Sequence, residues 1–122
     1  MKRLKFTAAL GLILVFASAG AHSKTITCGR SGQGKFRIDL SGNGIHHVQS
    51  RLLGGEKITP VVINSFRKLN CDECVQVTGE FDAGDRVVVG IATRQVGSST
   101  VADINIGVSD GSEGADSGVP CK

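Results

Sequence analysis

Four cysteines are the residues whose type and spacing most clearly suggest chemistry. Cys71 and Cys74 form a C-x-x-C inside Leu-Asn-Cys-Asp-Glu-Cys-Val-Gln, while Cys28 and Cys121 lie far from them in the sequence. The C-x-x-C spacing occurs in redox dithiols, in halves of zinc sites and where two structural disulfides meet. The compartment in which the chain folds therefore decides between a redox enzyme, a metal protein and a disulfide-bonded domain.

Residues 1–21 are typical of a secretory signal peptide. Three cations lie among the first five residues, an apolar run covers residues 8–16, and small residues follow. Two cleavage sites are equally plausible from the sequence, one after Ala19 and one after Ala21. The apolar run is too short to cross a bilayer, and no second run of membrane length follows. We therefore expect a secreted, extracellular protein without membrane insertion.

An even number of cysteines in a secreted chain of this size favours two structural disulfides. The two acidic residues inside the C-x-x-C disfavour the thiolate that a redox pair needs, and no second pair of ligands lies at zinc-finger spacing. A bridge between Cys71 and Cys74 would remove little entropy from the unfolded chain. We therefore expect Cys28–Cys71 with Cys74–Cys121, or else Cys28–Cys74 with Cys71–Cys121, and no metal or cofactor.

The formal net charge of +3 overstates how basic the secreted protein is. From His22 onward, eleven lysines and arginines face eleven carboxylates, which removes the main argument for a nucleic-acid partner. The charge is uneven: residues 22–70 carry eight cations and two carboxylates, whereas residues 71–122 carry three and nine. This indicates either two halves that attract each other within one fold or a basic face directed at an anionic partner.

About one hundred residues remain after the signal peptide, which is the size of one domain. Thr59 as an N-cap, Pro60 in the first helical position and an apolar stripe up to Leu69 predict a helix. Residues 45–53 fit either a strand or a helix. Alternation of polar and apolar residues, or a continuous apolar run, predicts strands at residues 25–28, 35–40, 75–81, 86–93 and 101–108.

These elements predict one α+β domain over residues 22–108. The C-x-x-C lies between the predicted helix and the next strand, where it can attach the helix to the sheet. Residues 109–122 are acidic and rich in glycine and serine, so their composition predicts a tail without regular structure. A disulfide through Cys121 is expected to tie this tail back to the domain.

Four short elements along residues 26–91 form a recognisable pattern. They are Ile26-Thr27-Cys28 followed by Ser31 and Gln33, Gly42-Asn43 followed by Ile45 and Val48-Gln49-Ser50, the stretch from Ile58 to Leu69 followed by Cys71 and Cys74, and Gly84 followed by Arg86-Val87-Val88-Val89. The pattern resembles a known family, the small secreted killer toxins encoded by double-stranded RNA viruses of smut fungi and their fungal relatives. The chain has fewer cysteines than the family, with Gly34 and Asp39 at two expected cysteine positions.

The resemblance implies a two-layer α/β sandwich, with one or two helices packed on one face of an antiparallel sheet. It also implies a non-enzymatic toxin that interferes with calcium entry through exposed basic residues. We separately expect a monomer. Arg37 lies where such a basic residue is expected, with Lys35 on the same face of its strand. The expected partner is then a protein or channel on the target-cell surface. A solvated strand face is the alternative for Lys35 and Arg37.

Other functions leave weaker signals in the sequence. His46 and His47 would point to opposite faces of a strand, and no serine lies in a nucleophile motif, so we expect no enzyme. Cleavage before His22 would leave an α-amine and imidazole that chelate copper, with His46 or His47 completing the site; a Gly20 start removes this alternative. The broader alternative is a secreted virulence effector or inhibitor that binds a host protein.

Overall fold

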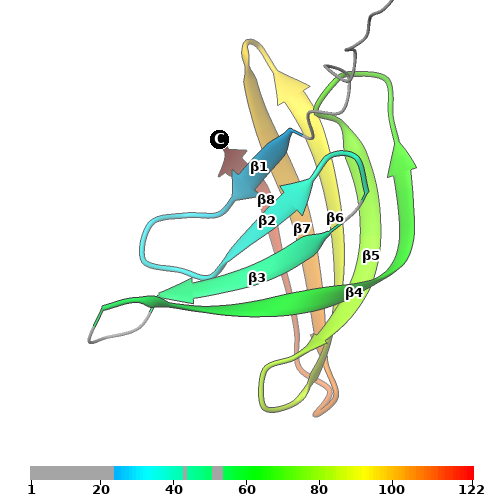
Figure 1. Cartoon of the computed structure of the whole chain (residues 1–122). Coiled ribbons are helices and arrows are strands. Elements are labelled where there is room, and N and C mark those ends of the chain that lie inside the picture. Colours follow the sequence, from blue (N-terminus) through cyan, green and yellow to red (C-terminus); the bar gives the residue numbers. More distant parts are fainter. Residues whose placement is uncertain (1–23, 43, 51–53) are drawn as a thin grey trace, which may run out of the picture.

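The computed structural model describes residues 24–42, 44–50 and 54–122. These residues form eight strands, each hydrogen-bonded to the next in the sequence, in a closed antiparallel barrel (Figure 1). The predicted signal peptide, the copper-binding His22 and residues 51–53 lie outside the described residues. The strands are β1 (Thr25–Cys28), β2 (Lys35–Asp39), β3 (Ile45–Ser50), β4 (Glu56–Lys68), β5 (Val75–Asp82), β6 (Arg86–Val96), β7 (Ser99–Val108) and β8 (Glu113–Cys121).

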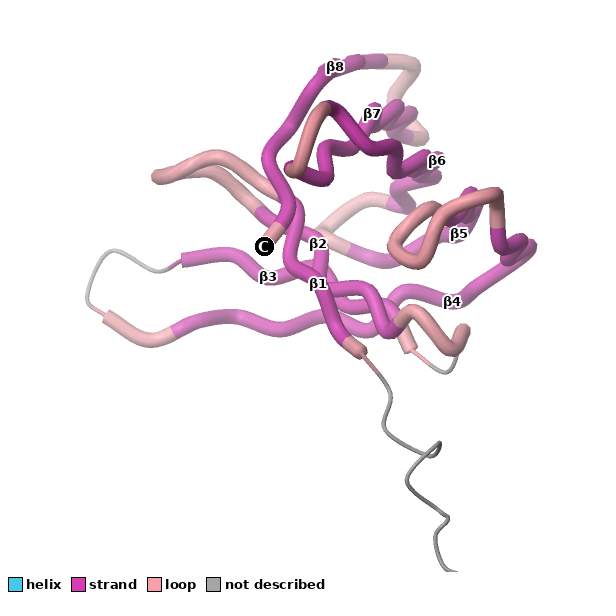
Figure 2. The backbone as a smooth tube through the Cα atoms, turned by 90° about the horizontal axis from the view of Figure 1, so that it is seen from above, coloured by secondary structure: helices cyan, strands magenta, loops and turns pink. Residues whose placement is uncertain are grey.

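The barrel contradicts the predicted α+β sandwich, and with it the fold that the killer-toxin resemblance implies. No helix occurs in the part of the chain that is described, so none there has the length and hydropathy to cross a membrane (Figure 2). The segment predicted as a helix is β4, which pairs with β3 through its first half and with β5 through its second.

A β-bulge in β4 explains why this strand looks helical in the sequence. The register shifts between Ile63 and Ser65, so that the side chains packed on the core come from Val61, Ile63 and Phe66. The bulge adds one residue to the period of two, which gives a spacing close to that of a helical stripe. The run of β-branched residues before the bulge favours a strand.

The remaining strands agree better with the predictions made from the sequence. Strands β1, β2, β5, β6 and β7 lie where alternation predicts them, and the ambiguous segment is strand β3 over Ile45–Ser50. The predicted irregular tail is also a strand, since Glu113–Cys121 forms β8 against β7. Its glycines and acids carry little strand signal, and the hydrogen bonds to β7 determine its conformation.

The barrel interior is a continuous apolar core. Eight strands enclose a space that side chains just fill, and burial alternates along the strands accordingly. Gly79 is needed where β4 bends onto β5, because a Cβ there would lie 2.7 Å from both the Val62 carbonyl oxygen and Cγ1 of Val61. The largest fully buried apolar side chains are Ile26, Ile38, Ile45, Val75, Val77 and Val89.

The cysteines form two disulfides, Cys28–Cys121 and Cys71–Cys74. Both predicted pairings are therefore wrong. The entropy argument behind them considered only the unfolded chain, whereas the folded barrel decides which cysteines meet. Cys28 and Cys121 are cross-strand partners of β1 and β8, and Cys71 and Cys74 are the two ends of a tight turn, with Cys74 N–H donating to the Cys71 carbonyl at 3.1 Å.

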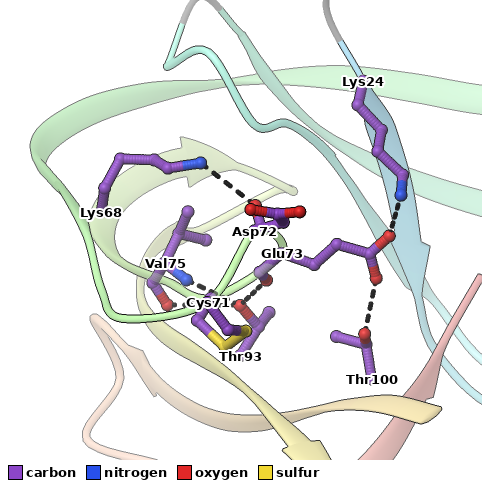
Figure 3. Close-up of a disulfide and its surroundings, with 9 residues drawn as sticks. Lys24, Lys68, Cys71, Asp72, Glu73, Val75, Thr93 and Thr100 are labelled. Carbon is purple, nitrogen blue, oxygen red and sulfur yellow. Dashed lines mark hydrogen bonds and ion pairs between the residues drawn. A yellow bond between two sulfur atoms is a disulfide. The ribbon is translucent and has the colours of Figure 1, made fainter. Parts of the chain in front are cut away.

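The turn that carries the C-x-x-C, residues 69–74, connects β4 to β5 and contacts three other parts of the barrel (Figure 3). Glu73 forms an ion pair with Lys24 and accepts a hydrogen bond of 2.5 Å from Thr100. The buried Thr93 hydroxyl donates to the Glu73 carbonyl at 2.6 Å and accepts from Val75 N–H at 2.8 Å. We call residues 69–74 the corner; its polar groups bind the barrel wall.

Candidate functional site

The barrel wall is least continuous at the seam, which we define as the boundary between β8 and the segment formed by β1 and the loop 29–34. In the ladder, β1 and β8 share a single residue pair, Cys28 with Cys121, whereas β6 and β7 pair along their whole length. Main-chain hydrogen bonds from Thr27 and Gly29 reach only Lys122, just after β8, and Pro120 near its end. Residues 113–117 of β8 therefore pair with β7 alone within the described structure.

A β-bulge in β8 accounts for this divergence from β1. It places Asp103 of β7 beside two residues of β8, Ser117 and Gly118, which both donate hydrogen bonds to Oδ1 of Asp103, at 2.8 and 3.0 Å. Hydrogen bonds from Arg94 above all, and then from Ser117 and Gly118, hold the pKa of Asp103 far below its usual range. Gly118 has a φ of 71°, which glycine adopts readily.

A pocket of about 320 Å³ opens at the seam beside the first half of β8. Its size is at the small end of the range for ligand pockets, which are mostly apolar with a few polar groups. Its inner wall is apolar, and loop 29–34 and β8 supply its rim. The lining residues are Gly29, Arg30, Gln33, Gly34, Phe36, His47, Ile104, Ile106, Gly114, Ala115, Asp116 and Val119.

His47 is the one ionisable group in an aromatic cluster at this pocket. Its ring stacks on Phe81 with centroids 4.7 Å apart and lies tilted against Phe36 at 5.1 Å. Burial, and secondarily the charge of Lys57, lowers the pKa of His47, which favours the neutral imidazole near neutral pH. No other described residue forms a hydrogen bond with this imidazole, and its Nε2 edge packs on Gly34.

Two glycines create the room in the pocket. A Cβ on Gly34 would lie 2.7 Å from Nε2 of His47, so only glycine lets the ring reach its position. Gly114 of β8 lies opposite Ile106, whose side chain packs on the core. Cross-strand partners share a face of the sheet, so Gly114 leaves the inner face empty at this point. A Cβ on Gly114 would meet no atom within 4 Å.

An ion pair closes the seam at one end of the pocket. Arg30 Nε and Nη2 donate to Oδ2 and Oδ1 of Asp116 at 3.1 and 3.2 Å. Arg30 Nη2 also donates to the Ser117 carbonyl at 3.3 Å. The hydrogen bonding with Arg30 lowers the pKa of Asp116. Arg30 and Asp116 belong to the basic and acidic halves of the sequence, as do Lys24 and Glu73, so both ion pairs support the prediction that the halves attract each other.

The predicted target-binding residues lie outside the pocket. Lys35 and Arg37 are on the outer face of β2, where Arg37 lies between Thr27 of β1 and His46 of β3. The stem of Lys35 packs on Gly29, where a Cβ would clash with its Cγ. The structure therefore confirms that the two cations share a strand face and separates them from the seam pocket.

The pocket is suited to binding by the chemistry of its lining. It presents apolar walls, an imidazole and an edge of backbone, and no hydroxyl or thiol is hydrogen-bonded to His47 in the described residues. The described residues also contain no cluster of three His, Cys, Asp or Glu that could hold a metal. His46 and His47 lie on opposite faces of β3, as their adjacency predicts, so they cannot form one site.

Sequence patterns did not indicate the seam pocket. Loop 29–34 is conspicuous only as a glycine-rich loop, and β8 has no apolar alternation that would place Gly114 on an inner face. The one available signal was electrostatic, because the basic half contains Arg30 and the acidic half contains Asp116. That signal predicts attraction between the two halves of the sequence, but it does not identify which residues form ion pairs.

Fold and pocket together define a small antiparallel β-barrel, closed by one long-range disulfide, with a pocket of ligand size at its seam. Comparisons of this chain with protein families, with curated proteins and with solved structures find no match.

Proposed function

We propose that this protein is a secreted, non-enzymatic binding protein of the toxin or effector type, and that its seam pocket receives an apolar group of its partner. The observation that carries the proposal is the pocket of about 320 Å³, in which Gly114 leaves the inner face beside Phe36 and His47 without a side chain. Small barrels normally fill their interiors with side chains. The unfilled space beside Gly114 is therefore unusual, and binding of a partner group explains it.

Two features support secretion and a binding role. Disulfides form and persist in oxidising compartments, and all four cysteines are bridged. The Cys28–Cys121 bridge lies at the seam, where it holds β1 against β8 beside the pocket. A scaffold fixed in this way keeps a pocket open without a ligand, which reduces the entropic cost of binding.

The test is a titration of the oxidised protein with N-phenyl-1-naphthylamine, a neutral apolar dye that fluoresces when it leaves water. We expect saturable binding to one site. The variant Gly114→Phe should weaken it by at least about tenfold, because the new ring enters the pocket on the Ile106 face. Gly114 has no positive φ and its Cβ position is open, so the substitution is compatible with the backbone.

The matched control is Gly90→Phe. Gly90 is also a strand glycine with ordinary φ and no atom within 4 Å of a Cβ, but it lies opposite Thr78 on the outer face. There it lines a different pocket of about 620 Å³, which Gly114 also borders, so the two variants distinguish the seam pocket from this second one. Dye affinity should stay at the wild-type value in this variant. Absence of saturable binding, or equal binding by the two glycine variants, would rule out the pocket as the binding site.

A second candidate function rests on the outer face of β1 and β2. Lys35 and Arg37 carry positive charge there, and Lys122 lines the same surface hollow as Lys35. None of the three forms an ion pair with another described residue. A cationic face of this kind could bind an anionic channel mouth and interfere with calcium entry. We expect Arg37→Ala to relieve any inhibition of calcium influx in fungal or plant cells, and Arg67→Ala on β4 to leave it unchanged.

A further inference from the structure

We propose that the first half of β8 accepts an extended segment of a partner protein as an added strand, and that one large apolar side chain of this segment fills the seam pocket. The inference rests on the proposed function, since it identifies the group that occupies the same pocket. The segment it requires has one aromatic or long aliphatic residue next to a lysine or arginine.

Residues 113–117 of β8 provide the edge for such a strand. They pair with β7 on one side, and no strand in the described residues pairs with their other side. All five residues are exposed. An exposed edge of this kind offers unpaired N–H and C=O groups to an incoming strand.

The backbone groups that face outward follow from the hydrogen-bond phase of the β7–β8 ladder. Val108 N–H donates to the Ser112 carbonyl at 2.8 Å, and hydrogen-bonded pairs alternate with unbonded pairs along an antiparallel ladder. Counted from that bond, Glu113 and Ala115 turn their N–H and C=O groups away from β7. The Ser117 carbonyl belongs to the same series, and it accepts a hydrogen bond of 3.3 Å from across the seam.

The pocket lies where the added strand would place a side chain. A residue directly opposite Gly114 shares its face of the sheet, which is the inner face on which Ile106 packs. Its side chain would enter the space that Gly114 leaves and meet Phe36 and His47. A flat aromatic ring fits against this pair, because aromatic rings pack well edge to face and offset.

Charge and length define the segment further. The neighbouring residue of the added strand lies opposite Glu113 on the outer face, and Glu113 forms no ion pair with another described residue. A lysine or arginine at that position would meet this carboxylate. The ion pair of Arg30 with Asp116 occupies the next inner position, so the paired stretch is limited to the positions opposite residues 113–115.

The first experiment is a selection of phage-displayed random heptapeptides on the oxidised protein, with counter-selection on Gly114→Phe. We expect enriched sequences to share one large apolar residue with a neighbouring lysine or arginine. The consensus peptide is then synthesised with single backbone N-methyl groups at each position in turn. N-methylation of an amide that pairs with β8 should weaken binding by about tenfold, whereas methylation of the amides between them should not.

Two variants of one residue test the edge from the side of the protein. Ala115→Pro removes an N–H that the fold does not use, as edge strands allow. We expect it to abolish peptide binding while binding of N-phenyl-1-naphthylamine in the pocket persists. Ala115→Thr keeps the N–H and should retain the peptide binding that Ala115→Pro loses.

Three results would overturn the inference. The first is a failure of any peptide to enrich over the counter-selection. The second is peptide affinity that does not depend on N-methylation at any position, which would place a side chain in the pocket without an added strand. The third is a dimer at the assay concentration that Ala115→Pro dissociates, since a second copy would then occupy the edge. Dye binding blocked by Gly114→Phe would still support the proposed function in each case.

Discussion

The corner and the seam both interrupt the regular barrel wall, and they differ in how their polar groups are used. At the corner, Glu73 has three polar partners, Lys24, Thr100 and Thr93, and the Thr93 hydroxyl also accepts from Val75 N–H. At the seam, His47 forms no hydrogen bond with another described residue, and Glu113 and Ala115 turn backbone groups to solvent. Buried polar groups that are satisfied stabilise a fold, whereas unsatisfied groups beside an unfilled pocket are characteristic of binding sites.

The two disulfides show the same difference. Cys71 and Cys74 are 3 residues apart and bridge a turn that its own hydrogen bonds already define. Cys28 and Cys121 are 93 residues apart and join the two ends of the sheet where the ladder has one pair. The long-range bridge therefore supplies the closure that strand pairing supplies elsewhere in the barrel.

Removing the bridges separately should give the largest effect. In the chain-entropy account, loss of Cys28–Cys121 costs about 4–5 kcal/mol and loss of Cys71–Cys74 about 2 kcal/mol. The first value is a large share of the typical stability of a domain, about 5–15 kcal/mol. The measurement is urea unfolding of Cys28→Ala/Cys121→Ala and of Cys71→Ala/Cys74→Ala. Equal losses would show that the seam is held by contacts other than its disulfide.

The variant Thr93→Val should have the next largest effect. Valine has the shape of threonine but leaves the Val75 N–H buried without an acceptor, and the Glu73 carbonyl loses its donor. An unsatisfied buried group costs about 1–3 kcal/mol. Ser31→Ala in the exposed seam loop 29–34 is the comparison, with an expected change within about 0.5 kcal/mol. A similar loss for both, measured by urea unfolding, would remove the contrast between corner and seam.

Local patterns predicted most of the strands because alternation reports burial on one face of a sheet. Patterns failed at the two bulges, where the period changes. In β4 the extra residue between Ile63 and Phe66 imitated a helix, and in β8 the bulge at Gly118 lies in a segment with almost no apolar residues. Closure of the barrel is a property of the whole sheet, which no single window of sequence contains.

The seam pocket could not be predicted for a related reason. It depends on Gly34 and Gly114, which are brought together by the pairing of β8 with β7 and by the position of loop 29–34. A glycine in a polar segment indicates only flexibility until its opposite neighbour is known. The formation of disulfides could be predicted, because it follows from the composition and the predicted compartment of the whole chain. The pairing of the cysteines could not, because it depends on the topology.

The pH dependence should separate His47 from the carboxylates. Burial lowers the pKa of His47, so the unfolded chain binds the proton more readily than the folded one. Stability should be constant above about pH 6.5 and fall as the pH decreases from there toward the lowered pKa. Hydrogen bonds from Lys24 and Thr100 lower the pKa of Glu73, so its contribution is lost only below about pH 4.5.

Urea unfolding at about pH 7.5 and about pH 5.5 measures the His47 effect. His47→Phe should abolish the loss between these values, and His46→Gln on the outer face of β3 should keep it. The affinity for N-phenyl-1-naphthylamine should decrease over the same range, because an imidazolium disfavours an apolar ligand. A pH response that survives in His47→Phe would assign the titration to another group.

The smallest effect on stability is expected for Arg30→Gln. This variant is instructive because it should change the rate of ligand association. Arg30 and Asp116 are both largely exposed, and ion pairs of that kind contribute little to folding. The pair nevertheless spans the seam at the pocket entrance, so its loss should speed the association of N-phenyl-1-naphthylamine with little change in unfolding. Arg94→Gln is the control, because Arg94 pairs with Asp103 on the outer wall. The association rates are measured by stopped flow. Equal rates in wild type, Arg30→Gln and Arg94→Gln would mean that ligands enter by another route. The seam at Arg30 would then be a closed part of the barrel wall, like the corner.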